Sequence, residues 1–218
     1  MPAEKPGIVV FLGPSLPKDK AEKVLEADFR PPAKRGDIYQ AAKEGAGIIL
    51  LIDGVFFQEC SVAHKEVIYA LEAGAKVLGA SSMGALRASE LDIYGMEGIG
   101  KIYLAYKSGH LVSDDEVALV FDPFSWEPRS EPLVNIRFNL DLARQMGVIS
   151  SSCKDRLFHC AQARYFPDRT YGRMLSDARA MVAEKELLRF REFLDKEKRD
   201  FKMEDAVLAL ERVRDMAK

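Results

Sequence analysis

The stretch Lys76-Val77-Leu78-Gly79-Ala80-Ser81-Ser82-Met83-Gly84-Ala85-Leu86-Arg87-Ala88-Ser89-Glu90 decides the fold, because it joins a buried strand to a helix through a tight turn. A short apolar run opens it over residues 76–78, small residues follow over 79–82, and a helix-forming run begins at Ala85. A turn of this kind directs backbone N–H groups and one hydroxyl at a ligand above the sheet. The stretch therefore predicts an α/β fold and the place of its site.

The centre of this stretch carries a pattern of serine hydrolases. Ala80-Ser81-Ser82-Met83-Gly84 reads as small-x-Ser-x-Gly with Ser82 at its centre. The serine elbow of hydrolases needs small residues at the two flanking positions, because its turn is strained and crowded. Ser82 is therefore a candidate nucleophile, and Gly84 is a candidate residue of the binding site. The alternative is that the serines only cap the helix.

Apolar runs alternate with helical segments along the first part of the chain. Strands are expected at residues 8–12, 48–52, 77–79 and 117–121. This alternation predicts an open, mostly parallel, Rossmann-like sheet with helices on both faces. Beyond residue 123 the pattern is helical, with helices expected at residues 133–146, 153–164, 176–198 and 203–217. The chain is thus expected to divide into an α/β core domain, residues 1–125, and a helical C-terminal region, residues 126–218.

Composition argues against several classes of protein. The formal net charge of −2 over 218 residues gives no general attraction to nucleic acid. No apolar run approaches the length of a membrane span and no leader pattern opens the chain, so a cytoplasmic protein without membrane contact is expected. Three cysteines without a CxxC spacing support neither disulfides nor a zinc site, and no metal is expected. Neither GxGxxG nor GxxxxGK[ST] occurs, so no nucleotide cofactor is expected.

Small or polar residues follow three of the expected strands. Gly13 and Ser15 come after the first strand, Asp53 after the second, and Ser81 with Ser82 after the third. In an open parallel sheet, ligands bind beyond the carboxyl ends of the strands. We therefore expect these residues to share a substrate site. Capping of the next loop is the other role open to Asp53.

Further candidates lie on the helices that follow this edge. His64 is a candidate general base, and Lys65 is a candidate for proton transfer, anion binding or oxyanion stabilisation. Glu66, in the first turn of the same helix, is expected beside them in the substrate site. The alternative for all three is a polar first turn of a capped helix. Arg87 either binds an anionic group or pairs with Glu90, three residues later.

Two other features are expected to carry less chemistry. Asp114-Asp115-Glu116 precedes an expected strand and is typical of a solvated loop, and no second cluster of ligands supports a metal there. Cys60 lies near the edge of the sheet, but nothing in the surrounding sequence activates its thiol.

Six stretches together resemble, in order, the TfuA-like family. They are Gly13-Pro14-Ser15-Leu16, Asp53-Gly54-Val55-Phe56, Ser61-Val62-Ala63-His64-Lys65-Glu66, Gly79-Ala80-Ser81-Ser82-Met83-Gly84-Ala85-Leu86-Arg87-Ala88, Gly95-Met96-Glu97-Gly98-Ile99-Gly100 and Asp114-Asp115-Glu116-Val117-Ala118. The resemblance covers residues 8–122, and only a helical expectation extends beyond them.

The resemblance implies a function. TfuA-like proteins accompany YcaO enzymes, which use ATP to convert a peptide backbone amide to a thioamide. They are associated with release of sulfide from a thiocarboxylated ThiS-like carrier and with stimulation of the YcaO enzyme. The peptide target is a glycine of methyl-coenzyme M reductase in methanogens and often a ribosomal natural-product precursor in bacteria. The expected partners are therefore a YcaO-family protein, the carrier and, through YcaO, a peptide or protein substrate.

Joined to the residues, this function predicts a mechanism. Ser82 attacks the carbonyl of the thiocarboxylate, or activates a water that does, and His64 or Lys65 accepts the proton. Backbone N–H groups after Ser82 hold the oxyanion, and Arg87 or Lys65 binds the thiocarboxylate. Two alternatives stay open, namely a non-catalytic activator that docks on YcaO and a stand-alone serine-type hydrolase. Whether the helical region forms a homodimer is also open.

Overall fold

The computed structural model describes residues 7–56 and 60–218, and the chain forms two compact units. One unit comprises Met1–Asp114 with Lys202–Lys218, and the other comprises Asp115–Phe201. We call them the sheet unit and the helical unit. The sheet unit thus includes most of the last helix of the chain, and the expected domain boundary at residue 125 stays a prediction.

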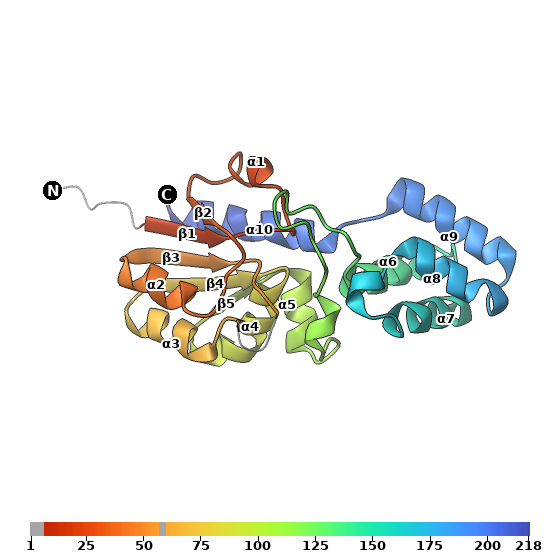
Figure 1. The fold of residues 1–218 in the computed structure, drawn as a ribbon, viewed down its shortest axis with the longest axis horizontal. Helices are drawn as coiled ribbons and strands as arrows, with labels where there is room; N and C mark the ends of the chain where they lie inside the picture. The colour runs from red at the N-terminus through yellow and green to blue at the C-terminus, as the bar shows by residue number, and fades with distance from the viewer. Residues whose placement is uncertain (1–6, 57–59) are drawn as a thin grey trace. The chain divides into compact units, whose positions relative to one another are not determined.

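Within the described residues, five strands form one sheet in which every pair of neighbours is parallel (Figure 1). They are β1 (Gly7–Phe11), β2 (Asp28–Arg30), β3 (Ala46–Leu51), β4 (Lys76–Ala80) and β5 (Glu97–Ile99), in the spatial order β2-β1-β3-β4-β5. The order runs in opposite directions on the two sides of β1, as in doubly wound folds. The predicted Rossmann-like sheet is confirmed.

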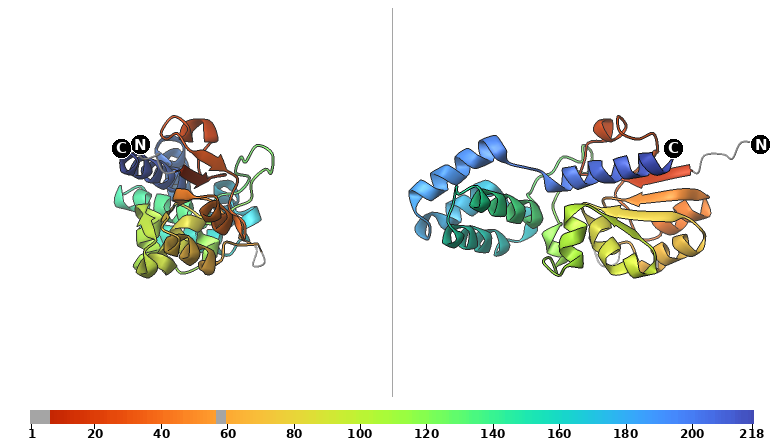
Figure 2. Two further views of the ribbon diagram at one scale, coloured as in Figure 1. Left: turned by 90° about the vertical axis from the view of Figure 1, so that its left-hand side faces the viewer. Right: turned by 180° about the vertical axis from the view of Figure 1, so that it is seen from behind.

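Helices cover both faces of the sheet. One face carries α2 (Asp37–Lys43), α3 (His64–Glu72) and α4 (Met83–Leu91), and the other carries α1 (Lys18–Ala21) and α10 (Phe201–Met216). Ile49 and Leu51 of β3 pack in the first apolar layer, whereas Ile48 and Leu50 pack in the second. Side chains alternate along a strand, so a strand buried on both faces must be apolar throughout. Figure 2 shows from behind how α10 runs along the sheet.

The two edge strands were not expected from the sequence, and one expected strand is absent. β2 and β5 have three residues each and include charged residues, which leaves no apolar run to detect. Residues 117–121 were expected to form a strand, and this prediction was wrong. That segment follows a short 3₁₀ helix, η2 (Asp114–Glu116), and forms a single bridge from Phe121 to Pro128.

Asp205 of α10 fixes the start of α5 (Gly100–Lys107). Its two carboxylate oxygens accept hydrogen bonds from the amides of Lys101 (2.9 Å) and Ile102 (2.8 Å). Gly100 has a φ of 94°, and a Cβ built on it would lie 2.3 Å from Cγ of Asp205. A residue more than 100 positions away thus satisfies amides that a helix leaves free at its N-terminus.

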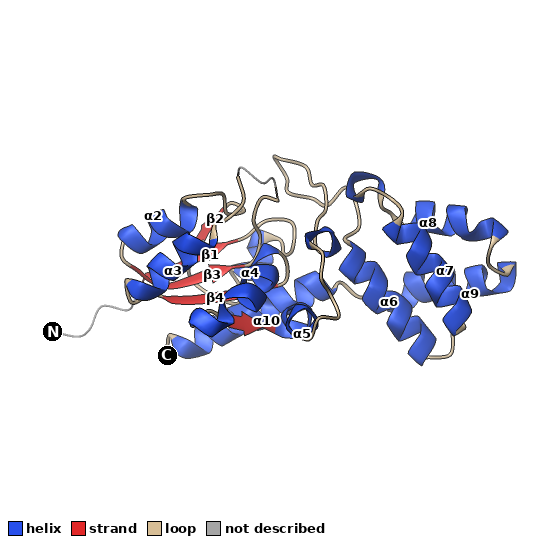
Figure 3. Ribbon diagram, turned by 90° about the horizontal axis from the view of Figure 1, so that it is seen from below, coloured by secondary structure: helices blue, strands red, loops and turns tan. Residues whose placement is uncertain are grey.

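The helical unit contains α6 (Leu133–Gln145), α7 (Ser151–Gln162), η3 (Phe166–Asp168), α8 (Tyr171–Asp177), η4 (Ala178–Ala180) and α9 (Glu184–Glu197) (Figure 3). The helix expected at residues 176–198 is divided in two, because the chain turns between η4 and α9. Arg169 and Glu116 are buried, and they form ion pairs with Asp115 and Arg137 respectively. Over the parts of the chain that the structure describes, no helix is long and apolar enough to cross a membrane.

Asp205→Ala should lower the free energy of unfolding by about 1–3 kcal/mol, because two amides at the start of α5 lose their acceptor. Urea unfolding followed by circular dichroism measures this change. Asp215→Ala, an exposed carboxylate on the same helix, is the matched control and should stay within about 0.5 kcal/mol of the wild type. Equal stability of the two variants would contradict the capping role of Asp205.

Candidate functional site

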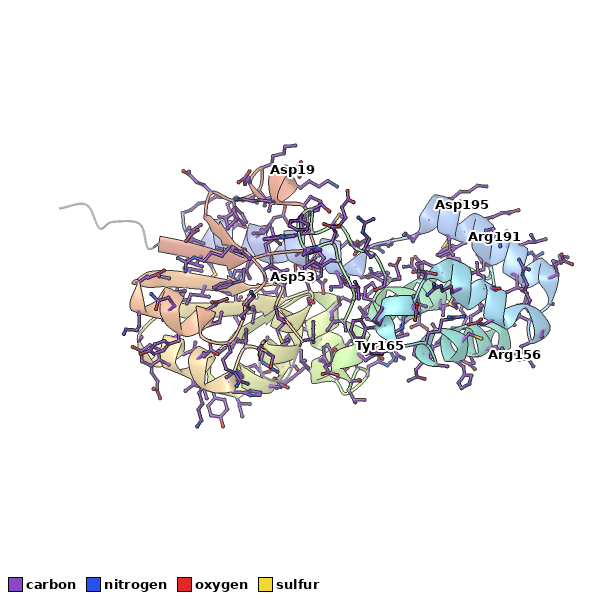
Figure 4. All side chains as sticks on the ribbon, viewed as in Figure 1. Asp19, Asp53, Arg156, Tyr165, Arg191 and Asp195 are labelled. Carbon is purple, nitrogen blue, oxygen red and sulfur yellow. The ribbon has the colours of Figure 1, made fainter. Side chains whose placement is uncertain are left out.

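Asp53, which Figure 4 labels, contacts the other residues expected at the ends of the first two buried strands. Its Oδ2 accepts hydrogen bonds from the amides of Gly13 (2.9 Å) and Ser15 (3.1 Å), and its Oδ1 accepts one from the Ser15 hydroxyl at 2.7 Å. Both Asp53 and Ser15 are buried. The three residues are close together, as expected, and the Asp53 carboxylate holds the loop after β1 in place.

This part of the edge is closely packed. A Cβ built on Gly13 would lie 2.4 Å from Cγ of Pro32 and 3.6 Å from Cβ of Asp53. Ligands of doubly wound folds usually bind at the point where the strand order reverses, which here lies between β1 and β3. At this point the buried side chain of Pro32 packs against Gly13. The role of Gly13, Ser15 and Asp53 in binding a substrate stays a prediction, and their observed contacts support the neighbouring turn.

The turn between β4 and α4 is strained at Ser81. Its φ is 65°, and the amide of Ser82 donates to the carbonyl of Ala80 at 2.7 Å, which closes a three-residue turn. A side-chain-bearing residue in such a conformation costs about 1–3 kcal/mol, and such residues cluster at functional sites. The Ser81 hydroxyl is fully buried and has no hydrogen-bond partner among the described residues. The strained residue therefore directly precedes Ser82, the serine that the sequence pattern favoured.

Glycines make this turn possible. A Cβ on Gly84 would lie 1.8 Å from the carbonyl oxygen of Leu51, and a Cβ on Gly79 would lie 2.2 Å from the carbonyl oxygen of Gly84. The start of α4 is thus pressed against the backbone of β3 and β4. This contact is the physical reason for the small residues that the elbow pattern contains.

The first turn of α4 keeps one amide free. The Gly84 amide donates to the carbonyl of Ile52, and the amides of Ala85 and Leu86 donate to the carbonyl of Ser82. The Met83 amide has no acceptor in residues 7–56 and 60–218. A helix N-terminus favours negative charge, so this amide suits an oxyanion that forms near the serines.

His64, Arg87 and Glu90 form a cluster between α3 and α4. Glu90 Oε2 lies 2.8 Å from His64 Nε2 and accepts a hydrogen bond from Arg87 Nη1 at 2.7 Å. Arg87 Nε also donates to the carbonyl of Val62 at 2.9 Å. The predicted alternative of an Arg87–Glu90 pair is confirmed. The same carboxylate also orients His64, a contact that the sequence did not predict.

The remaining candidates on α3 have different surroundings. Glu66 is buried, and its carboxylate accepts hydrogen bonds from the amides of Gly36 (2.7 Å) and Ala63 (3.1 Å). Lys65 is exposed and forms no ion pair with any residue that the structure describes. Glu66 therefore stabilises the starts of two helices, and Lys65 is free to contact a ligand.

A groove of about 520 Å³ opens beside this cluster. It is lined by Phe56, Ser61, Met83, Leu86, Arg87, Glu90, Val112, Ser113 and Asp114. The sequence did not mark Val112 or Ser113, because they belong to no expected element. We call this cavity the α4 groove, and Met83 joins it to the strained turn.

No group of three residues with metal-ligating side chains occurs among the described residues. The carboxylates of the acidic cluster separate, because Asp114 lines the α4 groove while Asp115 and Glu116 pair with arginines. The described part of the chain thus offers no ready metal centre. Arg87, Ser61 and Ser113 are instead polar groups that suit an organic anion at the α4 groove.

Gly84→Ala should lower the free energy of unfolding by at least about 3 kcal/mol, because the new methyl group overlaps the Leu51 carbonyl. Gly172→Ala is the matched control, since a Cβ there meets no atom within 4 Å. The control should leave stability unchanged or raise it by up to about 1 kcal/mol. Urea unfolding checks both variants, and a Gly84→Ala protein of wild-type stability would contradict the close packing of α4.

Comparison with known proteins supports the resemblance seen in the sequence. A family model described as TfuA-like protein matches residues 53–170, whereas no curated protein matches the chain. The match begins at Asp53, includes the strained turn and the residues 61–114 of the α4 groove, and extends into the helical unit. Because it covers more than half of the 218 residues, the chain belongs to the TfuA-like family.

Proposed function

We propose that this protein releases hydrosulfide from a thiocarboxylated ThiS-like carrier and supplies it to a YcaO enzyme that forms peptide backbone thioamides. Membership of the TfuA-like family supports the link to YcaO-dependent thioamidation. The observation that carries the hydrolytic step is the strained serine turn just before α4, where the buried Ser81 hydroxyl has no partner among the residues that the structure describes. Serine nucleophiles of α/β enzymes occupy strained turns between a strand and a helix.

The reaction proceeds in two steps. A serine oxygen attacks the carbonyl carbon of the thiocarboxylate, a C–O bond forms, the C–S bond breaks, and hydrosulfide leaves. Water then hydrolyses the acyl-serine ester, which yields the carrier carboxylate and restores the serine. The Met83 amide, for which no described residue is an acceptor, stabilises the oxyanion in both steps.

Two serines are candidates for the attack. Ser82 fits the small-x-Ser-x-Gly pattern, but the backbone strain belongs to Ser81, and the Ser81 hydroxyl is the fully buried one without a partner among the described residues. We favour Ser81, because a strained backbone that holds a buried hydroxyl without a partner carries two unfavourable terms that a purely structural serine does not need. Ser82 stays the candidate of the sequence pattern.

Three basic residues are candidates for proton transfer and for binding of the thiocarboxylate. His64 is oriented by Glu90, so one of its ring nitrogens is occupied and the other is available for a proton. Lys65 lacks an ion pair among the described residues and is the alternative proton acceptor. Arg87 keeps donors that neither Val62 nor Glu90 uses, and these suit the anionic thiocarboxylate.

Ser81→Ala should lower the rate of hydrosulfide release from a thiocarboxylated ThiS-type carrier at least about 100-fold, because the nucleophile is lost. Ser82→Ala should lower it less. Ser89→Ala is the matched control in α4, since its hydroxyl only bonds the carbonyl of Leu86, and it should keep the wild-type rate. Release measured with a sulfide-reactive dye, on variants with wild-type circular dichroism, checks these expectations. Wild-type rates in both Ser81→Ala and Ser82→Ala would contradict serine catalysis.

A non-catalytic activator is the second candidate function. The observation that favours it is the burial of both serines, with Ser81 at 0 % and Ser82 at 2 % relative exposure. An activator would bind the carrier tail or the YcaO enzyme without cleaving the thiocarboxylate. A wild-type protein that releases no hydrosulfide but stimulates thioamidation by YcaO would support this function over the hydrolytic one.

A further inference from the structure

A groove on the helical unit has no part in the proposed release of hydrosulfide. It has a volume of about 430 Å³ and is lined by Leu175, Arg179, Glu184, Leu187, Leu188 and Arg191. The first two residues belong to α8 and η4, and the others to α9, on which Figure 4 labels Arg191. We call it the α8–α9 groove. It lies outside residues 53–170, which the family model matches, so it is not part of what defines the family.

The groove offers apolar surface to a partner. Leu175 is buried, Leu187 is half-buried, and Leu188 is 53 % exposed. The volume lies in the range of about 300–1,000 Å³ that binding pockets occupy. A space of this size takes one or two large apolar side chains, such as an amphipathic helix presents when it binds in a groove.

The groove also carries uncompensated positive charge. The side chains of Arg179 and Arg191 have no ion pair or hydrogen bond among the described residues, and Glu184 is the one acidic residue of the lining. Several other arginines of the helical unit pair with carboxylates, as in Arg137–Glu116, Arg164–Asp177 and Arg173–Asp168. The two unpaired guanidinium groups beside leucines therefore suit a partner that brings both apolar and acidic side chains.

A second groove on the helical unit lacks this imbalance. It has a volume of about 380 Å³, and its lining includes Arg189, Lys196, Glu192 and Glu197, two basic and two acidic residues. Because its charges cancel, it favours no particular sign of partner. Charge thus distinguishes the α8–α9 groove from its neighbour.

We infer that the α8–α9 groove is a docking surface for an acidic amphipathic helix of the YcaO enzyme. Apolar side chains of that helix pack on Leu175 and Leu188, and its carboxylates pair with Arg179 and Arg191. Arginine is among the residues that contribute most to binding at protein interfaces. The identity of the partner rests on the proposed function. The position of the docking surface and the negative charge of the partner helix rest on the residues that line the groove.

Affinity measurements with the full-length protein and the YcaO enzyme of the same organism test the inference. The double variant Arg179→Glu/Arg191→Glu should bind at least about 10-fold more weakly, because both ion pairs become repulsive. Glu184→Gln should bind more tightly, because it removes the acidic residue of the groove. Arg144→Glu is the matched control and should bind as the wild type does. Arg144 is an exposed arginine of the helical unit outside the groove and forms no ion pair with a described residue.

The outcomes separate this inference from the proposed function. If the wild type binds YcaO and the double variant binds equally well, the docking surface is overturned while the proposed function stands. An equal loss in Arg144→Glu also overturns it, because the effect would then follow net charge alone. If the wild type does not bind YcaO, the partner in the proposed function and the docking surface fall together. The double variant should release hydrosulfide without YcaO at the wild-type rate.

Discussion

The contact between the first turn of α4 and the backbone of β3 and β4 is the constraint on which the site depends. Gly84 lies so close to the Leu51 carbonyl that no side chain fits between them, and Gly79 faces the Gly84 carbonyl in the same way. These close contacts restrict the backbone conformation of the turn that joins β4 to α4. The turn places Ser81 in a strained conformation and leaves the Met83 amide without an acceptor in the described part of the chain. Packing of the fold thus produces the chemical features of the turn.

Buried carboxylates hold the segments around this turn. Asp53, Glu66 and Asp205 each accept hydrogen bonds from two backbone amides, and all of these amides except that of Ala63 lie at least 30 residues away in the sequence. These bonds fix the loop after β1 and the starts of three helices. Each carboxylate satisfies amides that would otherwise be buried without a partner.

The sequence predicted the features that come from local patterns. Buried strands such as residues 48–52 have continuous apolar runs, and the small residues around Ser82 have a steric cause that the structure locates at Gly84. The edge strands escaped prediction because three residues carry no periodicity. The return of α10 to the sheet escaped it as well, because an amphipathic helix does not specify which surface it covers.

The positions of some site residues also follow from local sequence patterns, whereas those of others depend on the tertiary fold. Gly13, Ser15 and Asp53 are brought together as strand order implies, and Arg87 pairs with Glu90 as helical spacing implies. The sequence favoured Ser82 over Ser81 because the pattern of residues does not reveal backbone strain. Val112 and Ser113 of the α4 groove lie in a loop, where position depends on the whole fold.

The most direct test of serine catalysis is to find the covalent intermediate. The protein is mixed with thiocarboxylated carrier, quenched in acid within the first turnover, digested with trypsin and sequenced by mass spectrometry. The account predicts an ester between the carrier carboxyl terminus and Ser81 in the peptide of residues 77–87, and its disappearance in Ser81→Ala. Release of hydrosulfide during that turnover without any ester on this peptide would contradict it.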